Sequence, residues 1–170
     1  MASNNIFEEG NVVSILYPSD IQTKVTADWV DLSDYHALEI IFFKGVTTAG
    51  DDPVLTIQQA TSAAGAGAKD LVIDHYYLKS GTLLSTSSVG GVFTKTTMTA
   101  SNVITGHATS AEEQQLYGIH IEADMLDASG GFRYVTMNVA DTGTNACYGC
   151  ILGVLIPARY QQEQTPNPLD

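Results

Sequence analysis

The chain has 170 residues, which suits one domain that buries about 70% of the surface its unfolded form exposes. Its 7 basic and 19 acidic residues give a formal charge of −12, which argues against binding to nucleic acid or an anionic membrane, because both need clustered lysine and arginine. No apolar run approaches the roughly 18 residues of a membrane span, and residues 1–10 lack the basic and apolar regions of a signal peptide. We therefore expect a protein that is made in the cytoplasm and stays soluble.

The two chain ends are polar. Residues 1–10 are expected to form an N-terminal arm, and residues 158–170, which contain two prolines, are expected to form a C-terminal arm. Residues 11–157 carry the apolar segments, so we expect them to fold as a single domain.

The first strands are predicted directly after the N-terminal arm. Residues 11–17 are rich in valine, isoleucine and leucine, and a turn is predicted at residues 18–20, which contain a proline. Residues 21–26 alternate between apolar and polar side chains, which predicts a half-exposed strand.

The most apolar segment is residues 37–43, with the sequence ALEIIFF and one charge, Glu39. It is rich in β-branched and aromatic residues and too short for a helix, so we predict a central strand covered on both faces. A polar turn follows. Residues 54–59 then read as a second strand, with Leu55 and Ile57 on one face, and we expect the two strands to form a hairpin.

The second half of the chain is predicted to contain further strands. Within residues 71–78, Ile73 and Tyr77 are expected on one face and Tyr76 on the other, because side chains alternate along a strand. Within residues 116–122 the even-numbered residues are expected to oppose the odd-numbered ones in the same way.

The remaining segments complete the pattern. Residues 79–115 are rich in glycine, serine and threonine, and residues 92–98 within them read either as a strand that leaves the sheet or as part of a long loop. Residues 123–127 are expected to form a short helical turn, and the last two strands are predicted at residues 132–139 and 148–156. About eight short strands with almost no helical periodicity predict an all-β, single-domain β-sandwich, of which the jelly roll is one form.

Four segments carry a resemblance to a known family. They are V-D-L-S-D-Y at residues 30–35, L-x-I-Q-Q-A-T-S-A-A-G-A-G-A-K-D-L at 55–71, I-E-A-D-x-L-D-x-x-x-G-F-R-Y-V at 121–135 and P-A-R-Y at 157–160. Together they resemble the small capsid decoration, or cement, proteins of tailed bacteriophages, which are accessory shell proteins and not enzymes. The resemblance implies a protein on the outer surface of a virion that binds the major capsid protein and itself, as a homodimer or homotrimer, and needs no cofactor.

The charge is compatible with an outer location. A packaged genome makes the inside of a shell strongly negative, so a chain of charge −12 would be repelled there and tolerated outside. The residues expected to contact the capsid or another copy are chosen by their place at the chain ends and by the small side chains of one loop. They are Ile6, Phe7, Ala63, Ala64, Gly65, Ala66, Gly67, Ala68, Lys69, Arg159 and Tyr160.

Two cysteines, Cys147 and Cys150, form a C-Y-G-C pattern, which fits either half of a zinc site or a redox pair. The sequence holds no second cysteine pair and no paired histidine spacing. Residues three apart on a strand face opposite sides, so we expect two packed free thiols.

No metal site and no catalytic centre is predicted. The four histidines are scattered, at His36, His75, His107 and His120. Asp51 with Asp52, and Asp124 with Asp127, carry the oxygen ligands that calcium prefers, but aspartates that cap their own turns are the simpler interpretation. A serine nucleophile elbow and a phosphate-binding glycine loop are both missing from the sequence, so a hydrolase on a sandwich scaffold is the least supported reading.

An alternative function rests on aromatic residues. A sugar-binding face, a core or a protein interface would each use such side chains, and the candidates are Trp29, Tyr35, Tyr76, Tyr77, Tyr148 and Tyr160. The alternative is therefore a carbohydrate-binding or host-adhesion module on the virion surface.

Overall fold

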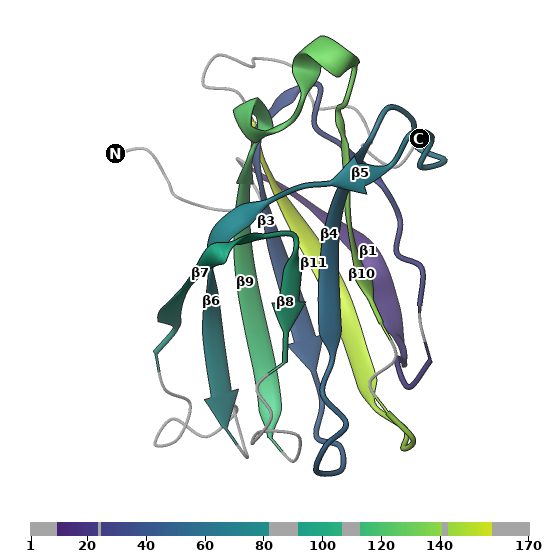
Figure 1. The fold of residues 1–170 in the computed structure, drawn as a ribbon, viewed down its shortest axis with the longest axis vertical. Coiled ribbons are helices and arrows are strands. Elements are labelled where there is room, and N and C mark those ends of the chain that lie inside the picture. The colour runs from purple at the N-terminus through teal and green to yellow at the C-terminus, as the bar shows by residue number, and fades with distance from the viewer. Residues whose placement is uncertain (1–9, 24, 82–91, 107–112, 141–142, 158–170) are drawn as a thin grey trace.

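The computed structural model describes residues 10–23, 25–81, 92–106, 113–140 and 143–157. Nearly all regular structure in these ranges is β, arranged as two antiparallel sheets that pack face to face (Figure 1). The predicted all-β sandwich is confirmed. No helix in the described part of the chain has the length and hydrophobicity that a membrane span requires.

The larger sheet has six strands. In spatial order they are β1 (Asn11–Asp20), β11 (Tyr148–Pro157), β3 (Tyr35–Lys44), β9 (Gln114–Glu122), β6 (Ile73–Gly81) and β7 (Thr94–Ser101). The smaller sheet contains β2 (Val30–Asp31), β10 (Tyr134–Val139), β4 (Val54–Ala60) and β5 (Lys69–Asp70), and β8 (Val103–Thr105) also pairs with β4. Two 3-10 turns, η1 (Ala123–Met125) and η2 (Ala128–Gly130), join β9 to β10.

The strand order is that of a jelly roll. The strands β1-β11-β3-β9 form one layer and β2-β10-β4-β8 the other. The chain therefore changes sheet on passing from β1 to β2, β2 to β3 and β3 to β4, and again from β8 to β9, β9 to β10 and β10 to β11. This interleaving produces the two Greek keys of a jelly roll. Strands β6 and β7 extend the larger sheet beyond β9.

The core lies between the two sheets. On β3, Leu38, Ile40 and Phe42 are fully buried and face the smaller sheet, where Leu55 and Ile57 are also fully buried. Burial of each such side chain contributes about 1.5–3 kcal/mol. This layer of aliphatic and aromatic side chains holds the sandwich together.

Two expectations about the central strand were wrong. On the outward face Ala37 is fully buried, but Glu39, Ile41 and Phe43 are only half-buried, so most of this face of β3 is not covered. Strands β3 and β4 do not form a hairpin, because they belong to different sheets. Each strand has one apolar face, and stacking two such faces buries more apolar surface than joining the strands edge to edge.

The N-terminal part also differs from prediction. Strand β1 continues through residues 18–20, where a turn was expected, because a register shift between Leu16 and Ser19 accommodates Pro18 on this edge strand. Residues 21–26 form no strand in the described part of this segment, which makes one bridge from Val25 to Val139.

The faces of β6 differ from the expected alternation. Ile73 is in the core, but Tyr76 and Leu78 also pack toward it while Tyr77 is exposed. The pairing of β6 with β7 shifts between Ile73 and His75, and this irregularity changes which side chains face inward. In β9 the predicted alternation is confirmed, with Tyr117, Ile119 and Ile121 buried.

Candidate functional site

Three of the four motif segments meet at one end of the sandwich. Strand β4 ends and β10 begins there, because Ala60 pairs with Tyr134, and Tyr134 in turn pairs with Asp31 on β2. We call this end, formed by residues 29–35, 59–70 and 123–134, the motif end. In Figure 1 it lies at the top, with the loop before β5 at the right and the two green helical turns to its left.

An ion pair at the centre of the motif end joins the second and third segments. The Nζ atom of Lys69 lies 2.5 Å from Oδ2 of Asp127 and 4.0 Å from the centre of the Phe132 ring. Oδ1 of Asp127 also accepts hydrogen bonds from Oγ of Ser129 at 2.7 Å and the backbone N–H of Gly130 at 3.0 Å. The Lys69 contact is the largest cause that lowers the pKa of Asp127 to about 2.

Hydrogen bonds through Gln59 strengthen the same junction. Its side chain is buried, accepts a hydrogen bond from the backbone N–H of Asp127 at 2.9 Å and donates one to the carbonyl of Asp70 at 3.4 Å. The backbone N–H of Arg133 donates to the carbonyl of Ala60 at 3.1 Å. The second and third segments are therefore joined by hydrogen bonds from backbone as well as side-chain groups.

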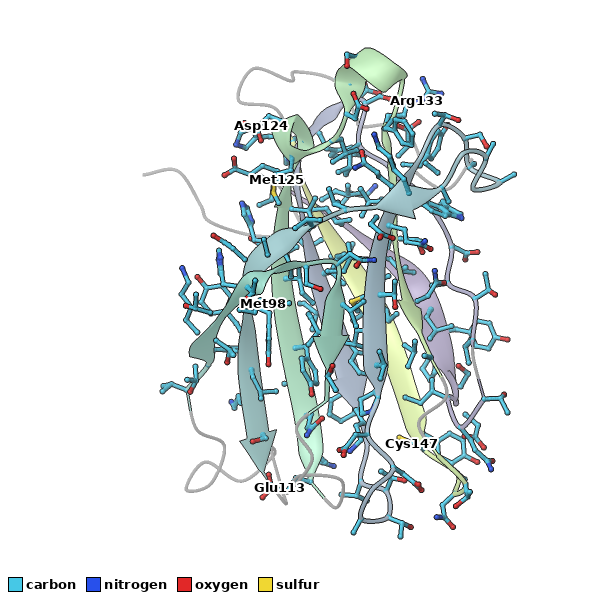
Figure 2. All side chains as sticks on the ribbon, in the orientation of Figure 1. Met98, Glu113, Asp124, Met125, Arg133 and Cys147 are labelled. Carbon is cyan, nitrogen blue, oxygen red and sulfur yellow. The ribbon has the colours of Figure 1, made fainter. Side chains whose placement is uncertain are left out.

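Arg133 connects the first segment to the third. Its guanidinium lies 3.5 Å from the Asp31 carboxylate, donates to the Tyr134 hydroxyl at 3.0 Å and stacks 5.1 Å from the centre of that ring. The Tyr134 hydrogen bond is the main cause that raises the pKa of Arg133, followed by the charge of Asp31. The Leu32 N–H donates to the Arg133 carbonyl at 2.9 Å. In Figure 2, Arg133 is labelled at this end with Asp124 and Met125, while Cys147 and Glu113 lie at the opposite end.

The loop of residues 61–68, which we call the alanine loop, presents small side chains on an ordered backbone. The Thr61 N–H donates to the Ala66 carbonyl at 3.0 Å, and Gly65 has a φ of +75°. A Cβ atom on Gly65 would lie 2.8 Å from Nε1 of Trp29, so glycine lets the indole pack against the loop. Its exposed small residues are Ala63, Ala64, Ala66, Gly67 and Ala68.

Both ends of the described jelly roll also lie at the motif end. Strand β1 begins there, since Asn11 pairs with Leu155, and β11 finishes there, since Pro157 pairs with Tyr35. The Nδ2 atom of Asn11 donates to the Tyr35 hydroxyl at 3.5 Å. The two chain ends predicted to act as arms therefore attach beside the motif end.

The two basic side chains of the motif end are both engaged in ion pairs. Lys69 and Arg133, the basic side chains of the motif end, face carboxylates, and the Asp127 carboxylate is taken up by hydrogen bonds. The motif end as a whole keeps an excess of carboxylates, because Asp34, Asp70 and Asp124 are exposed on it as well.

The structure places the predicted contact residues unevenly. Ile6, Phe7, Arg159 and Tyr160 lie outside the described residues, whereas Ala63, Ala64, Gly65, Ala66, Gly67, Ala68 and Lys69 all belong to the motif end. Sequence reasoning did not assign Gln59, Asp127 and Arg133 to this site. They lie inside the quoted motifs, but pairing Lys69 with Asp127, 58 residues further along the chain, requires knowledge of the topology.

Among the other residues considered from sequence, the two cysteines and Asp51 have structural roles, and His107 lies outside the described residues. Cys147 and Cys150 are free, and burial raises the pKa of both thiols, which lowers their reactivity. Asp51 does not cap its own turn; its carboxylate accepts hydrogen bonds from the side chain of Asn145 at 2.9 Å and the backbone N–H of Thr144 at 3.2 Å, and so joins two loops. Within the described ranges, no group of three or more His, Cys, Asp or Glu side chains is placed to hold a metal ion.

The aromatic candidates do not gather on one surface. Trp29 packs against the alanine loop, Tyr35 is buried and Tyr76 lies 5.8 Å from the core residue Tyr117, measured between ring centres. Tyr77 and Tyr148 are exposed but stand on β6 and β11, which β3 and β9 separate, and Tyr160 lies outside the described residues.

Comparison of the chain with known protein families, curated proteins and solved structures found no match.

Proposed function

We propose that the protein is a capsid decoration, or cement, protein that binds the outer surface of a bacteriophage shell through the motif end. The observation that supports the proposal most is the meeting of the three motif segments in space. They lie far apart in the chain, yet Lys69–Asp127 and Asp31–Arg133 join them into one surface. Stability of the fold alone would not require the three segments that resemble decoration proteins to lie at the same end of the sandwich.

Charge and reach fit this role. The net charge of −12 favours the outside of a shell filled with nucleic acid, and the motif end itself has its basic groups paired. An extended segment of ten residues spans up to about 35 Å, so chain ends that leave beside the motif end have the length to cross a joint between shell subunits. A durable contact requires burial of about 1,000 Å² or more.

A cement protein stabilises the shell by mass action. Each bound copy favours the assembled state over the separated subunits, in proportion to its occupancy. The jelly roll then serves as a rigid mount that holds the motif segments in one arrangement. The core and the two interlocking sheets keep this mount stable while the end surface makes the contact.

The proposal is tested by binding to empty phage shells that were assembled without this protein. Ala66→Glu places a charge on the exposed alanine loop, and Ala49→Glu places the same charge on an exposed turn at the opposite end of the sandwich. We expect Ala66→Glu to lower shell occupancy at least tenfold and Ala49→Glu to leave it unchanged. Equal occupancy for the two variants, with both folded, would exclude the alanine loop as the contact.

The arms are tested in the same assay. Variants that lack residues 1–9 or residues 158–170 are expected to keep the thermal stability of the full chain and to bind shells more weakly. If both truncated proteins occupied shells as fully as the complete chain, the chain ends would have no part in attachment.

A further inference from the structure

The centre of the outward face of the larger sheet is apolar. We call this outward face the outer sheet face; it consists of the side chains on β1, β11, β3, β9, β6 and β7 that point away from the smaller sheet. The pairing registers place one row of residues across all six strands. In spatial order this row is Ser14, Leu152, Ile41, Gly118, Tyr77 and Lys95.

The row contains a projection and a hollow on either side of its centre. Leu152 on β11 is 39% exposed, and Gly118 on β9 has no side chain. A Cβ atom at Gly118 would lie 3.6 Å from Cβ of Tyr77 and 4.0 Å from Cε1 of Phe93, so these aromatic residues form one wall of the hollow. Ile41 lies between the projection and the hollow, since it pairs with both Leu152 and Gly118.

This spacing makes the face complementary to itself. A two-fold axis that runs along β3 would place β11 of one copy against β9 of the other, and therefore Leu152 of each copy over Gly118 of its partner. Isologous contacts of this kind place the same patch of both copies in one interface. Sheets that stack face to face keep their strands within about 30° of each other, which such an axis allows.

The size and charge of the face also fit a second copy. Six strands spaced by about 4.8 Å, with roughly ten residues of about 3.3 Å each, outline a face of about 900 Å², within which Ala37 and Val154 are already buried in the single chain. A standard interface buries about 800 Å² on each partner. The pairing registers place three carboxylates (Asp20, Glu39 and Glu122) and two lysines (Lys79 and Lys95) on this face, an excess of one negative charge, so two copies of a chain that carries −12 would meet there with little repulsion.

Two of the acidic side chains of the face are held within each copy. Nδ1 of His120 lies 2.7 Å from Oε1 of Glu39, and Nε2 of the same ring lies 3.4 Å from Oε1 of Glu122. Both carboxylates therefore have a partner on their own sheet when the histidine is protonated.

We propose that the outer sheet face is the self-association surface of this protein, and that two copies dock there with Leu152 of each in the Gly118 hollow of the other. The two-fold axis runs along the strands, so both motif ends point in the same direction. Under the proposed function a dimer would therefore reach the shell with two contact surfaces at once, which raises avidity. The docking itself does not depend on a shell.

The proposal is tested on the full chain in solution. Sedimentation equilibrium is expected to give twice the chain mass of 18.1 kDa at micromolar concentration. Leu152→Glu is expected to raise the dimer dissociation constant at least about thirtyfold, as for other central interface residues. Val46→Glu, which replaces an exposed apolar residue in a loop at the end of the sandwich opposite the motif end, is the control and is expected to leave the constant unchanged.

An exchange of the projection and the hollow gives a sharper test. Gly118→Leu alone is expected to fill the hollow and weaken the dimer, and a Cβ atom at this position would make only ordinary van der Waals contacts in the monomer. Combining Gly118→Leu with Leu152→Ala moves the projection to β9 and the hollow to β11, so it is expected to restore the dimer.

Several results would overturn the proposal. These are a monomer at 100 µM, a trimer, or a dimer that neither Leu152→Glu nor Gly118→Leu weakens. A monomer whose Leu152→Glu variant loses shell occupancy would assign the face to the shell. A monomer whose Leu152→Glu variant melts at a lower temperature than Val46→Glu would show that the same chain covers the face.

Discussion

Single residues at the motif end explain why its sequence is rich in glycine and charged groups. Gly65 must be glycine for two reasons, its φ of +75° and the indole of Trp29 that would lie 2.8 Å from a Cβ atom. Asp127 serves as the hydrogen-bond acceptor for three groups on two segments. Residue types that looked like turn formers in the sequence are therefore parts of one surface.

Gly65→Ala is expected to destabilise the fold more than Gly131→Ala. Both glycines have a positive φ, of +75° and +78°, but a Cβ atom at Gly131 would meet nothing within 4 Å. The Gly131 variant therefore carries the backbone cost alone, about 1–2 kcal/mol, and the Gly65 variant must also displace Trp29. Urea unfolding measures both free energies. Equal losses would mean that Trp29 does not depend on the glycine.

Asp127 is expected to make stability depend on pH in the acid range. Its pKa is about 2 in the folded protein against 3.8 ordinarily, with the Lys69 contact as the main cause, so the folded state favours the carboxylate. The contribution is present above pH 3.8 and disappears as the pH falls through about 2. Asp127→Asn is expected to melt below the wild type at pH 6 and to approach it at pH 2. A difference in melting temperature that stays constant over this range would contradict the assignment.

At the scale of elements, the strands that could be predicted are those whose side chains alternate or form a dense β-branched run. Residues 37–43 and 116–122 fall within β3 and β9 for this reason. The prediction of a turn at residues 18–20 was wrong because an edge strand tolerates a proline where its register shifts. The predicted assignment of β6 side chains to its two faces was wrong because a register irregularity changes the alternation, and no local sequence pattern reveals such an irregularity.

The candidate site was predictable only in part. The alanine loop stood out by composition, and Asp127 and Arg133 lay in motifs that the sequence made visible. Lys69 and Asp31 lie in the quoted motifs too, but their pairing with Asp127 and Arg133 could not be predicted, because these contacts cross between elements that only the jelly-roll topology brings together. Local sequence patterns determine strands and turns, whereas the contacts between segments depend on how the sheets stack.

Strand β3 is expected to show a strong asymmetry between its faces. Ile40→Ala removes a fully buried side chain between the sheets and should cost about 2–5 kcal/mol of unfolding free energy. Ile41→Ala removes a half-buried side chain on the outer sheet face and should cost less when unfolding is extrapolated to low protein concentration. Similar losses for the two variants would indicate that both faces of β3 are covered in the monomer.

The whole molecule combines a rigid double sheet with one surface that gathers distant segments. The jelly roll places the motif end, the start of β1 and the finish of β11 on one side of the molecule, and it leaves the outer sheet face turned sideways. Under the two proposals, attachment to a shell and association between copies use different surfaces. This separation lets each be removed by substitution without loss of the other.

Electron cryo-microscopy of empty phage shells mixed with the full chain tests the central claim most directly. The account predicts density for a jelly roll on the outside of the shell, with the alanine loop and the η2 turn against the capsid protein and the turn at residues 45–53 pointing to solvent. Shells without this density at saturating protein, or a jelly roll attached through residues 45–53, would contradict it.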